Sequence, residues 1–233
     1  MKYQNVLRAF VLGLALLALA TLPQSASASV IGHLSFANCD GLGVVVTLTT
    51  VDWLPAGGGT GCIAAGIGTT VTFDTGSITP AEHGTVNDLS AGVGNTGFLT
   101  FAGVTFDLAS DGPGVSNIAC VNTFNPSDPA CSVFTGSPFV LTPGSTGTSV
   151  SFAVRGLAID ATSTNSPWSG AFTTQIAGVT PLDIQNAILA KNGSFQATYS
   201  FDGNVGIPEP VSLTLIGFGL IAFAGLKRRK SRP

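Results

Sequence analysis

Basic residues are nearly absent from the middle of this 233-residue sequence. Between Ser29 and Gly206 the chain has two of them, Arg155 and Lys191, against eleven acidic residues, which gives this stretch a formal charge of −9. The other seven lysines and arginines lie close to the two ends. Because a surface of this sign repels the phosphate backbone of nucleic acids, we expect no nucleic acid among the partners of the chain.

The residue types and motifs of common active sites are also scarce. His33 and His83 are the only histidines, no serine lies in a GxSxG motif, and no HExxH motif is present. The strongest catalytic candidate is the group formed by His83, the adjacent Glu82 and Asp88 further along the chain. We favour the alternative that these residues simply belong to a solvated loop. We therefore expect no enzyme, no catalytic residue and no cofactor, and a secreted hydrolase is the least favoured function.

Residues 1–28 have the three parts of a secretory signal peptide. Lys2 and Arg8 supply positive charge, residues 9–22 form an apolar run, and Ala26-Ser27-Ala28 is a small-x-small cleavage pattern. We expect cleavage directly after this pattern, with Ser29 as the new N-terminus. A retained N-terminal anchor helix is less favoured, because the run is short for a membrane span.

The C-terminal segment, 206–233, consists of three blocks. A Pro208-Glu209-Pro210 motif is followed by a continuous apolar run, 211–226, which we predict to be a transmembrane helix. As a helix it is about 24 Å long at about 1.5 Å per residue, and snorkelling of basic side chains extends it towards the membrane core of about 30 Å. The positive-inside rule places the basic tail, 227–233, in the cytoplasm. The membrane-flanking basic residues are Lys227, Arg228, Arg229, Lys230 and Arg232.

This tail resembles the PEP-CTERM sorting signal of exported bacterial proteins that are handled by exosortase, a membrane-embedded enzyme similar to cysteine proteases. The resemblance rests on all three blocks in order, behind a signal peptide. It implies that Pro208, Glu209 and Pro210 are the sorting element, and that an exosortase-type enzyme and the membrane are partners. It also implies removal of the helix and basic tail, and transfer to the cell surface or an exopolysaccharide matrix. The alternative is a plain single-pass anchor in which the motif is accidental.

Between these ends, residues 29–205 are typical of an all-β domain. Short apolar and β-branched runs alternate with turns rich in Gly, Pro, Asn and Asp. Several runs are apolar on both faces, which suits the inner layers of a sandwich. We therefore predict a single antiparallel β-sandwich. Its expected strands are 44–51, 69–73, 97–108, 148–159, 171–179 and 194–201.

Residues 180–193 depart from this pattern and predict a short helix. Thr180 is a good N-cap, Pro181 suits the first helical position, and Asp183 completes a capping box. We expect this helix to close one end of the sandwich before the last strand. The segment from Trp168 through this helix to the last strand is also similar to β-sandwich ectodomains carried on PEP-CTERM proteins.

The four cysteines, Cys39, Cys62, Cys120 and Cys131, all lie in the exported part. An even number of cysteines in an oxidising compartment predicts two disulfides, which can pair in three ways. We favour the two pairings that are local in sequence, Cys39–Cys62 and Cys120–Cys131. A metal site with four thiolate ligands is less favoured, because no two of these cysteines are close enough in sequence to form a CxxC knuckle.

These features favour a structural or adhesive protein of the cell surface or biofilm matrix that associates with exopolysaccharide. Trp53 and Trp168 are the aromatic residues to test first for stacking on sugars, although core packing is the favoured role for both. The alternative is a calcium-stabilised adhesin, because calcium binds several oxygens at once. With no DxDxDG loop to support it, we expect no specific metal site. The candidate ligands for calcium are carboxylates near turns: Asp40, Asp74, Asp107, Asp111 and Asp202.

Overall fold

The structure is a computed structural model that describes residues 30–39, 41–54, 60–90, 95–162 and 165–206. All of them belong to one compact unit, Ala28–Ile207. The predicted signal peptide, sorting motif, membrane helix and basic tail, as well as Asp40, lie outside the described residues. Within the described part of the chain, there is no helix long and apolar enough to cross a membrane.

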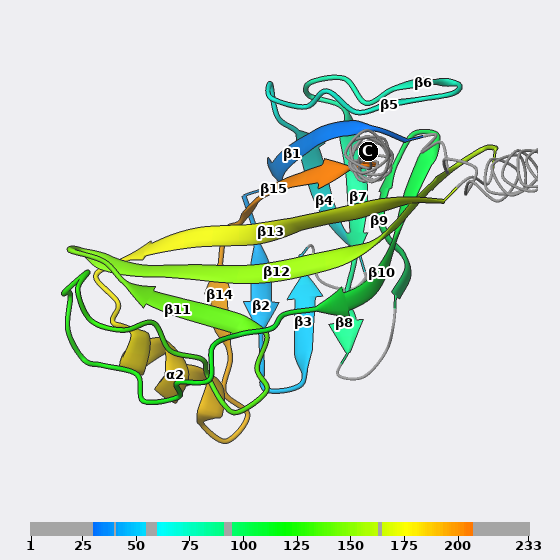
Figure 1. The fold of residues 1–233 in the computed structure, drawn as a ribbon. Helices are drawn as coiled ribbons and strands as arrows, with labels where there is room; N and C mark the ends of the chain where they lie inside the picture. The colour runs from blue at the N-terminus through cyan, green and yellow to red at the C-terminus, as the bar shows by residue number, and fades with distance from the viewer. Residues whose placement is uncertain (1–29, 40, 55–59, 91–94, 163–164, 207–233) are drawn as a thin grey trace, which may run out of the picture. The chain divides into compact units, whose positions relative to one another are not determined.

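The described residues form fifteen strands and one short helix, which confirms the expected all-β class. Figure 1 shows how these elements are arranged. The helix is α2 (Pro181–Leu189), and it lies between β13 and β14 in the chain. The strands are β1 (Gly32–Asn38), β2 (Val44–Val46), β3 (Thr50–Trp53), β4 (Thr60–Ala65), β5 (Thr72–Phe73), β6 (Gly76–Ser77), β7 (His83–Asn87), β8 (Leu89–Ser90), β9 (Asn95–Phe101), β10 (Val104–Asp111), β11 (Phe139–Pro143), β12 (Gly147–Asp160), β13 (Asn165–Ala177), β14 (Phe195–Ala197) and β15 (Ser200–Val205).

Eight strands close into an antiparallel barrel, in the order β10-β9-β7-β4-β1-β15-β13-β12, with β12 pairing back to β10. The predicted sandwich is therefore wrong for the core of the fold. The long strand β12 explains the difference, because two strands share one of its edges (Figure 1). Residues 148–152 pair with β11, whereas residues 154–160 pair with β10. The other edge of β12 pairs with β13 along almost its whole length.

Two of the predicted strands are in fact hairpins. The run 44–51 forms β2 and the start of β3, joined by a turn in which the Thr47 N–H donates to the Thr50 carbonyl oxygen at 2.9 Å. The run 97–108 forms most of β9 and β10, which are joined through Gly103 with a φ of 85°. Both turns reverse the chain inside an apolar run, so the runs indicate strands but not their number.

Large aromatic side chains fill the barrel. Phe36 of β1, Phe172 of β13 and Phe201 of β15 meet with ring centroids 4.7 to 5.7 Å apart. Trp168 of β13 packs edge-on against Phe106 of β10, with centroids 5.8 Å apart. Burying a ring of this kind contributes about 1.5–3 kcal/mol to stability. The interior is thus a packed core, and ligand chemistry has to lie elsewhere on the molecule.

A second sheet, in the order β14-β2-β3-β8, faces the part of the first sheet that contains β11, β12 and β13. Trp53 of β3 contacts Phe172 of β13, with ring centroids 4.7 Å apart, and Val44 and Val46 of β2 face the same interior. This local pair of sheets resembles part of a sandwich, attached to the barrel. The gap between the sheets is about 50 Å³, whereas ligand sites typically have roughly 300–1,000 Å³. The gap therefore belongs to the core.

Helix α2 lies beside this two-sheet region and contacts β11 and β14. It begins with the predicted capping box: the Asp183 N–H donates to Thr180 Oγ1 at 3.3 Å, and the Thr180 N–H donates to Asp183 Oδ2 at 3.1 Å. Ile184 and Ile188 are buried in one cluster with Leu141 of β11. The predicted short helix is therefore confirmed, and it covers an apolar edge of the fold; two strands follow it, where the sequence predicted one.

Both disulfides join cysteines that are local in sequence, Cys39 to Cys62 and Cys120 to Cys131. The Cα atoms are 5.5 Å apart in the first pair and 5.3 Å apart in the second, distances that suit a disulfide. These are the two pairings favoured from the sequence. They leave no free cysteine in the described part of the chain.

The second disulfide is also connected to the helix. Gln185 of α2 is buried, and its Nε2 donates to the carbonyl oxygens of Ile118 at 3.0 Å and Val133 at 2.9 Å. These two residues lie just before Cys120 and just after Cys131. One buried amide therefore holds both ends of the disulfide loop against the helix.

Phe172 lies where the barrel core meets the second sheet, so its truncation tests whether these two parts form one core. We expect Phe172→Ala to lower the free energy of unfolding by about 3–5 kcal/mol. The measurement is urea unfolding of the compact unit, followed by tryptophan fluorescence. The matched control is Phe124→Ala, because Phe124 is 42% exposed and its truncation should cost about 0.5 kcal/mol or less. Equal losses in the two variants would contradict this packing.

Candidate functional site

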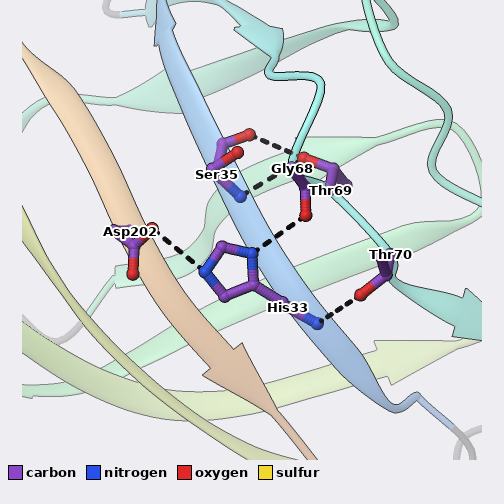
Figure 2. A network of polar contacts seen from close by, with 6 residues as sticks. All are labelled: His33, Ser35, Gly68, Thr69, Thr70 and Asp202. Atoms are coloured by element: carbon purple, nitrogen blue, oxygen red, sulfur yellow. Dashed lines mark hydrogen bonds and ion pairs between the residues drawn. The ribbon is translucent and has the colours of Figure 1, made fainter.

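A histidine on the outside of the barrel is held by a network of polar contacts (Figure 2). His33 lies on β1, and Asp202 points towards it from the neighbouring strand β15. His33 Nε2 is 3.0 Å from Asp202 Oδ2, and Nδ1 is 3.0 Å from the carbonyl oxygen of Gly68. Because a carboxylate and a carbonyl only accept hydrogen bonds, both ring nitrogens donate, which requires the imidazolium form. Within the described residues this is the one ion pair.

The same network fastens the loop between β4 and β5 to β1 (Figure 2). The His33 N–H donates to Thr70 Oγ1 at 3.1 Å, and the Thr70 N–H donates to the His33 carbonyl oxygen at 2.8 Å. The Ser35 N–H donates to Thr69 Oγ1 at 3.2 Å, and that hydroxyl donates to the Ser35 carbonyl oxygen at 2.7 Å. The Gly66 N–H donates to the Ser35 carbonyl oxygen at 2.8 Å, so the start of the loop is also held against β1.

The environment of His33 favours its charged form and excludes a role as a general base. The bond to the Gly68 carbonyl, followed by the bond to Asp202, raises the pKa of His33 above its ordinary value. In a Ser/His/Asp triad one ring nitrogen accepts the proton of the nucleophile. Both nitrogens of His33 are already donating, so neither can accept a proton from Ser35. We interpret His33 as a charged clamp that holds the β4–β5 loop.

The raised pKa makes this clamp sensitive to pH. Its contribution to stability is fully present below the unfolded-state pKa of about 6.5 and is lost as pH rises through the higher folded-state pKa. A partly exposed pair contributes less than about 1 kcal/mol, so we expect His33→Gln to lower Tm by about 1–3 °C at about pH 5.5. At about pH 9 the loss should nearly disappear. Thermal unfolding at both pH values tests this, and an equal loss at both would contradict the clamp.

The structure separates the residues of the strongest predicted catalytic group. Glu82 Oε2 accepts the backbone N–H three residues earlier at 3.0 Å. Asp88 Oδ1 accepts the Trp53 N–H at 2.8 Å, and partial burial raises the pKa of Asp88. His83 instead faces the first disulfide, with Nδ1 3.8 Å from Cys62 Sγ. The three side chains have different partners and do not form a catalytic set.

Cys39, Cys62 and His83 gather at one place on the barrel, which the sequence did not suggest. Cys62 lies on β4, His83 lies on the adjacent strand β7, and Cys39 follows the end of β1 on the other side of β4. Their sulfur and ring nitrogen atoms all lie within 4.8 Å of one another. Metal ligation requires thiolates, whereas both sulfurs are bonded in a disulfide. The group is therefore not a metal site in this form.

The candidate calcium ligands do not converge on a common site. Asp107 Oδ1 accepts the Gly97 N–H at 2.6 Å, and Asp202 is bonded to His33. Asp74 and Asp111 are exposed elsewhere on the domain. Across the described ranges, the cysteine–histidine group is the only set of three or more His, Cys, Asp or Glu side chains close enough to share an ion. The calcium alternative therefore gains no support from the geometry.

The two tryptophans considered for sugar stacking are core residues. Trp53 is 2% exposed and Trp168 is 3% exposed. Trp168 Nε1 also donates to the carbonyl oxygen of Asp107 at 3.0 Å, which fixes the ring inside the barrel. The core packing that the sequence favoured for both rings is therefore confirmed, and any sugar contact has to come from other residues.

An open groove of about 470 Å³ lies beside the turn between β2 and β3. Its volume is within the roughly 300–1,000 Å³ of typical ligand sites. Threonine and serine hydroxyls lie next to apolar side chains in its lining, a mixture that suits a sugar polymer. Sequence patterns could not reveal this groove, because its lining comes from several separate segments. It includes Thr47, Thr49, Thr50, Ser90, Ser110, Phe134 and Pro138.

Comparison with protein-family models, with curated proteins and with solved structures found no match to this chain. The sequence signals and the chemistry of the described residues therefore provide the indications of function. Among these, the two disulfides indicate an oxidising compartment outside the cytoplasm.

Proposed function

We propose that this protein is exported to the cell surface or extracellular matrix, is sorted by an exosortase-type system, and has a structural or adhesive role in association with exopolysaccharide. The observation that carries this proposal is the order of three parts: a signal peptide, a disulfide-linked domain and the Pro208-Glu209-Pro210 tail. Export accounts for the disulfides, because they persist in oxidising compartments. The apolar run and basic cluster account for a membrane-bound stage before release.

The end of the described fold is compatible with a cut at the tail. The last strand, β15, ends at Val205, and the Gly206 N–H donates to the carbonyl oxygen of Pro167 at 2.7 Å. Pro208 follows two residues later in the sequence. A cut at or beyond the motif would leave every described hydrogen bond of the barrel in place, as a released matrix protein requires.

The outer face of β12, β13 and β15 supports an association with sugars. Its two charged groups, Arg155 and Asp202, are bonded to Ser110 and His33. Neutral hydroxyl and amide groups lie on the same face: Gln175 Nε2 donates to Ser149 Oγ at 2.8 Å, and the hydroxyls of Thr173 and Ser200 lie 3.2 Å apart. Such groups both donate and accept hydrogen bonds, as the hydroxyls of a polysaccharide do. Together with the groove beside the β2–β3 turn, they provide a surface for a hydroxyl-rich polymer.

Mutation of the sorting motif tests the first half of the proposal. In a host with an exosortase-type system, we expect the recovered wild-type protein to lack residues 1–28 and everything beyond about Pro210. In Glu209→Ala most of the protein should retain residues 211–233, because the sorting element is incomplete. Intact mass measurement distinguishes the two forms, and Ser212→Ala is the control that should be processed normally. A wild-type protein that retains residues 211–233 would show that the tail is a permanent anchor.

Filling the groove tests the second half. Ser90 lies in the groove lining, so Ser90→Trp should reduce retention of the domain by the polysaccharide of its own host about tenfold, which corresponds to about 1.4 kcal/mol. The measurement is co-sedimentation of the purified domain with that polysaccharide. Ser77→Trp, at an exposed position on β6 outside both the groove lining and the outer face of β12, β13 and β15, is the matched control and should bind normally. Wild-type protein that is not retained at all would remove the association from the proposed function.

A further inference from the structure

The two disulfides have different surroundings. Cys131 is fully buried, and the Cys120–Cys131 bond lies in the apolar cluster that contains Leu141 and Ile184. A thiol from solvent cannot reach Cys131 Sγ in this cluster. A Cys131 thiolate would also be poorly solvated there, which makes it a poor leaving group. This disulfide is therefore protected from exchange.

The Cys39–Cys62 disulfide is more open and has a histidine beside it. Both cysteines are partly exposed, and His83 is exposed. His83 Nδ1 lies 3.8 Å from Cys62 Sγ. This position follows from the strand register: His83 pairs with Ala64 of β4, two residues from Cys62, so both side chains lie on the outer face of adjacent strands.

We propose that Cys39–Cys62 is a site of thiol–disulfide exchange, at which the protein becomes covalently joined through Cys39 to a thiol-bearing peptide. The incoming thiolate attacks Cys39 Sγ and forms a new S–S bond. The Cys39–Cys62 bond breaks, and its electron pair passes to Cys62 Sγ, which leaves as a thiolate beside the ring of His83. One disulfide replaces another, so the step consumes the attacking thiol and needs no other oxidant or reductant.

His83 determines which of the two sulfurs leaves. Exchange is faster when the leaving sulfur is stabilised as a thiolate, and a histidine beside a cysteine sulfur supplies that stabilisation. His83 is within hydrogen-bonding reach of Cys62 Sγ. Cys62 therefore becomes the free thiol, and Cys39 carries the new bond.

The fold can tolerate the opening of this disulfide. Strand β1 is paired with β4 through residues 36–38 and with β15 through residues 32–37. The Cys39 N–H also donates to the carbonyl oxygen of Cys62 at 3.3 Å. These backbone bonds hold the two cysteines near each other after exchange, so the joined form keeps the barrel.

Exchange with reduced glutathione tests the proposal, which does not depend on the proposed association with polysaccharide. The full chain is recovered oxidised after export, purified in detergent, mixed with glutathione at neutral pH, quenched with acid, alkylated and mapped by mass spectrometry. We expect glutathione on Cys39 and an alkylated Cys62, while Cys120–Cys131 stays closed. His83→Ala should slow the initial rate of adduct formation about tenfold.

Two controls separate this chemistry from a general loss of structure. His33→Ala removes the other histidine and should leave the rate at Cys39 unchanged. The rate of opening of Cys120–Cys131, measured in the same sample, reports global unfolding of each variant. If His83→Ala is destabilised by that measure, His83→Asn replaces it. The proposal is overturned by equal opening of the two disulfides in the wild-type chain, by glutathione on Cys62, or by an unchanged rate in a folded His83 variant.

Discussion

Closure of the barrel depends on how closely β10 approaches β12, and Gly156 lies at that contact. A Cβ atom at this position would overlap the carbonyl oxygen of Asp107 and lie 2.8 Å from Trp168 Nε1. Without a side chain there, β10 pairs with β12 from Val104 to Asp111, and Trp168 Nε1 donates to the same Asp107 oxygen. The Trp168 indole is then fixed inside the barrel, against Phe106 and Phe201. The absence of a side chain at Gly156 thus permits both the strand pairing that closes the barrel and the hydrogen bond of the Trp168 indole N–H.

Because aromatic side chains fill the interior of the barrel, any site for a ligand or reaction has to lie on its outer surface. Besides the hydroxyl-rich outer face of β12, β13 and β15, three groups of described residues lie there: the clamp of His33 and Asp202, the groove beside the β2–β3 turn, and the first disulfide with His83. The clamp is a structural feature, because both of its ring nitrogens are engaged. The groove and the disulfide are the places where we propose that a partner is held, at the groove by hydrogen bonds and at the disulfide by a covalent bond.

Local patterns predicted the parts of this fold that depend on local contacts. The capping box of α2 joins two residues three positions apart, and both disulfides join cysteines of neighbouring segments. Closure could not be predicted, because it depends on the pairing of β10 with β12, which alternation within each strand does not encode. The turn at Thr47 was missed since it has neither Gly nor Pro and is held instead by hydroxyl bonds to Thr50. The clamp joins His33 to Asp202 across 169 residues, a distance at which sequence spacing carries no information.

The two disulfides show how the same bond can have two uses in one domain. The loop closed by Cys120 and Cys131 contains no strand, so the disulfide and the amide of Gln185 supply the order that backbone pairing does not. At Cys39 and Cys62 the strands are already paired, and the disulfide duplicates a constraint that the sheet provides. A constraint that is duplicated can be released without loss of the fold. The disulfide that duplicates a constraint of the sheet is also the one whose two cysteines are partly exposed and lie beside a histidine. This combination is the basis for the chemical role that we propose for it.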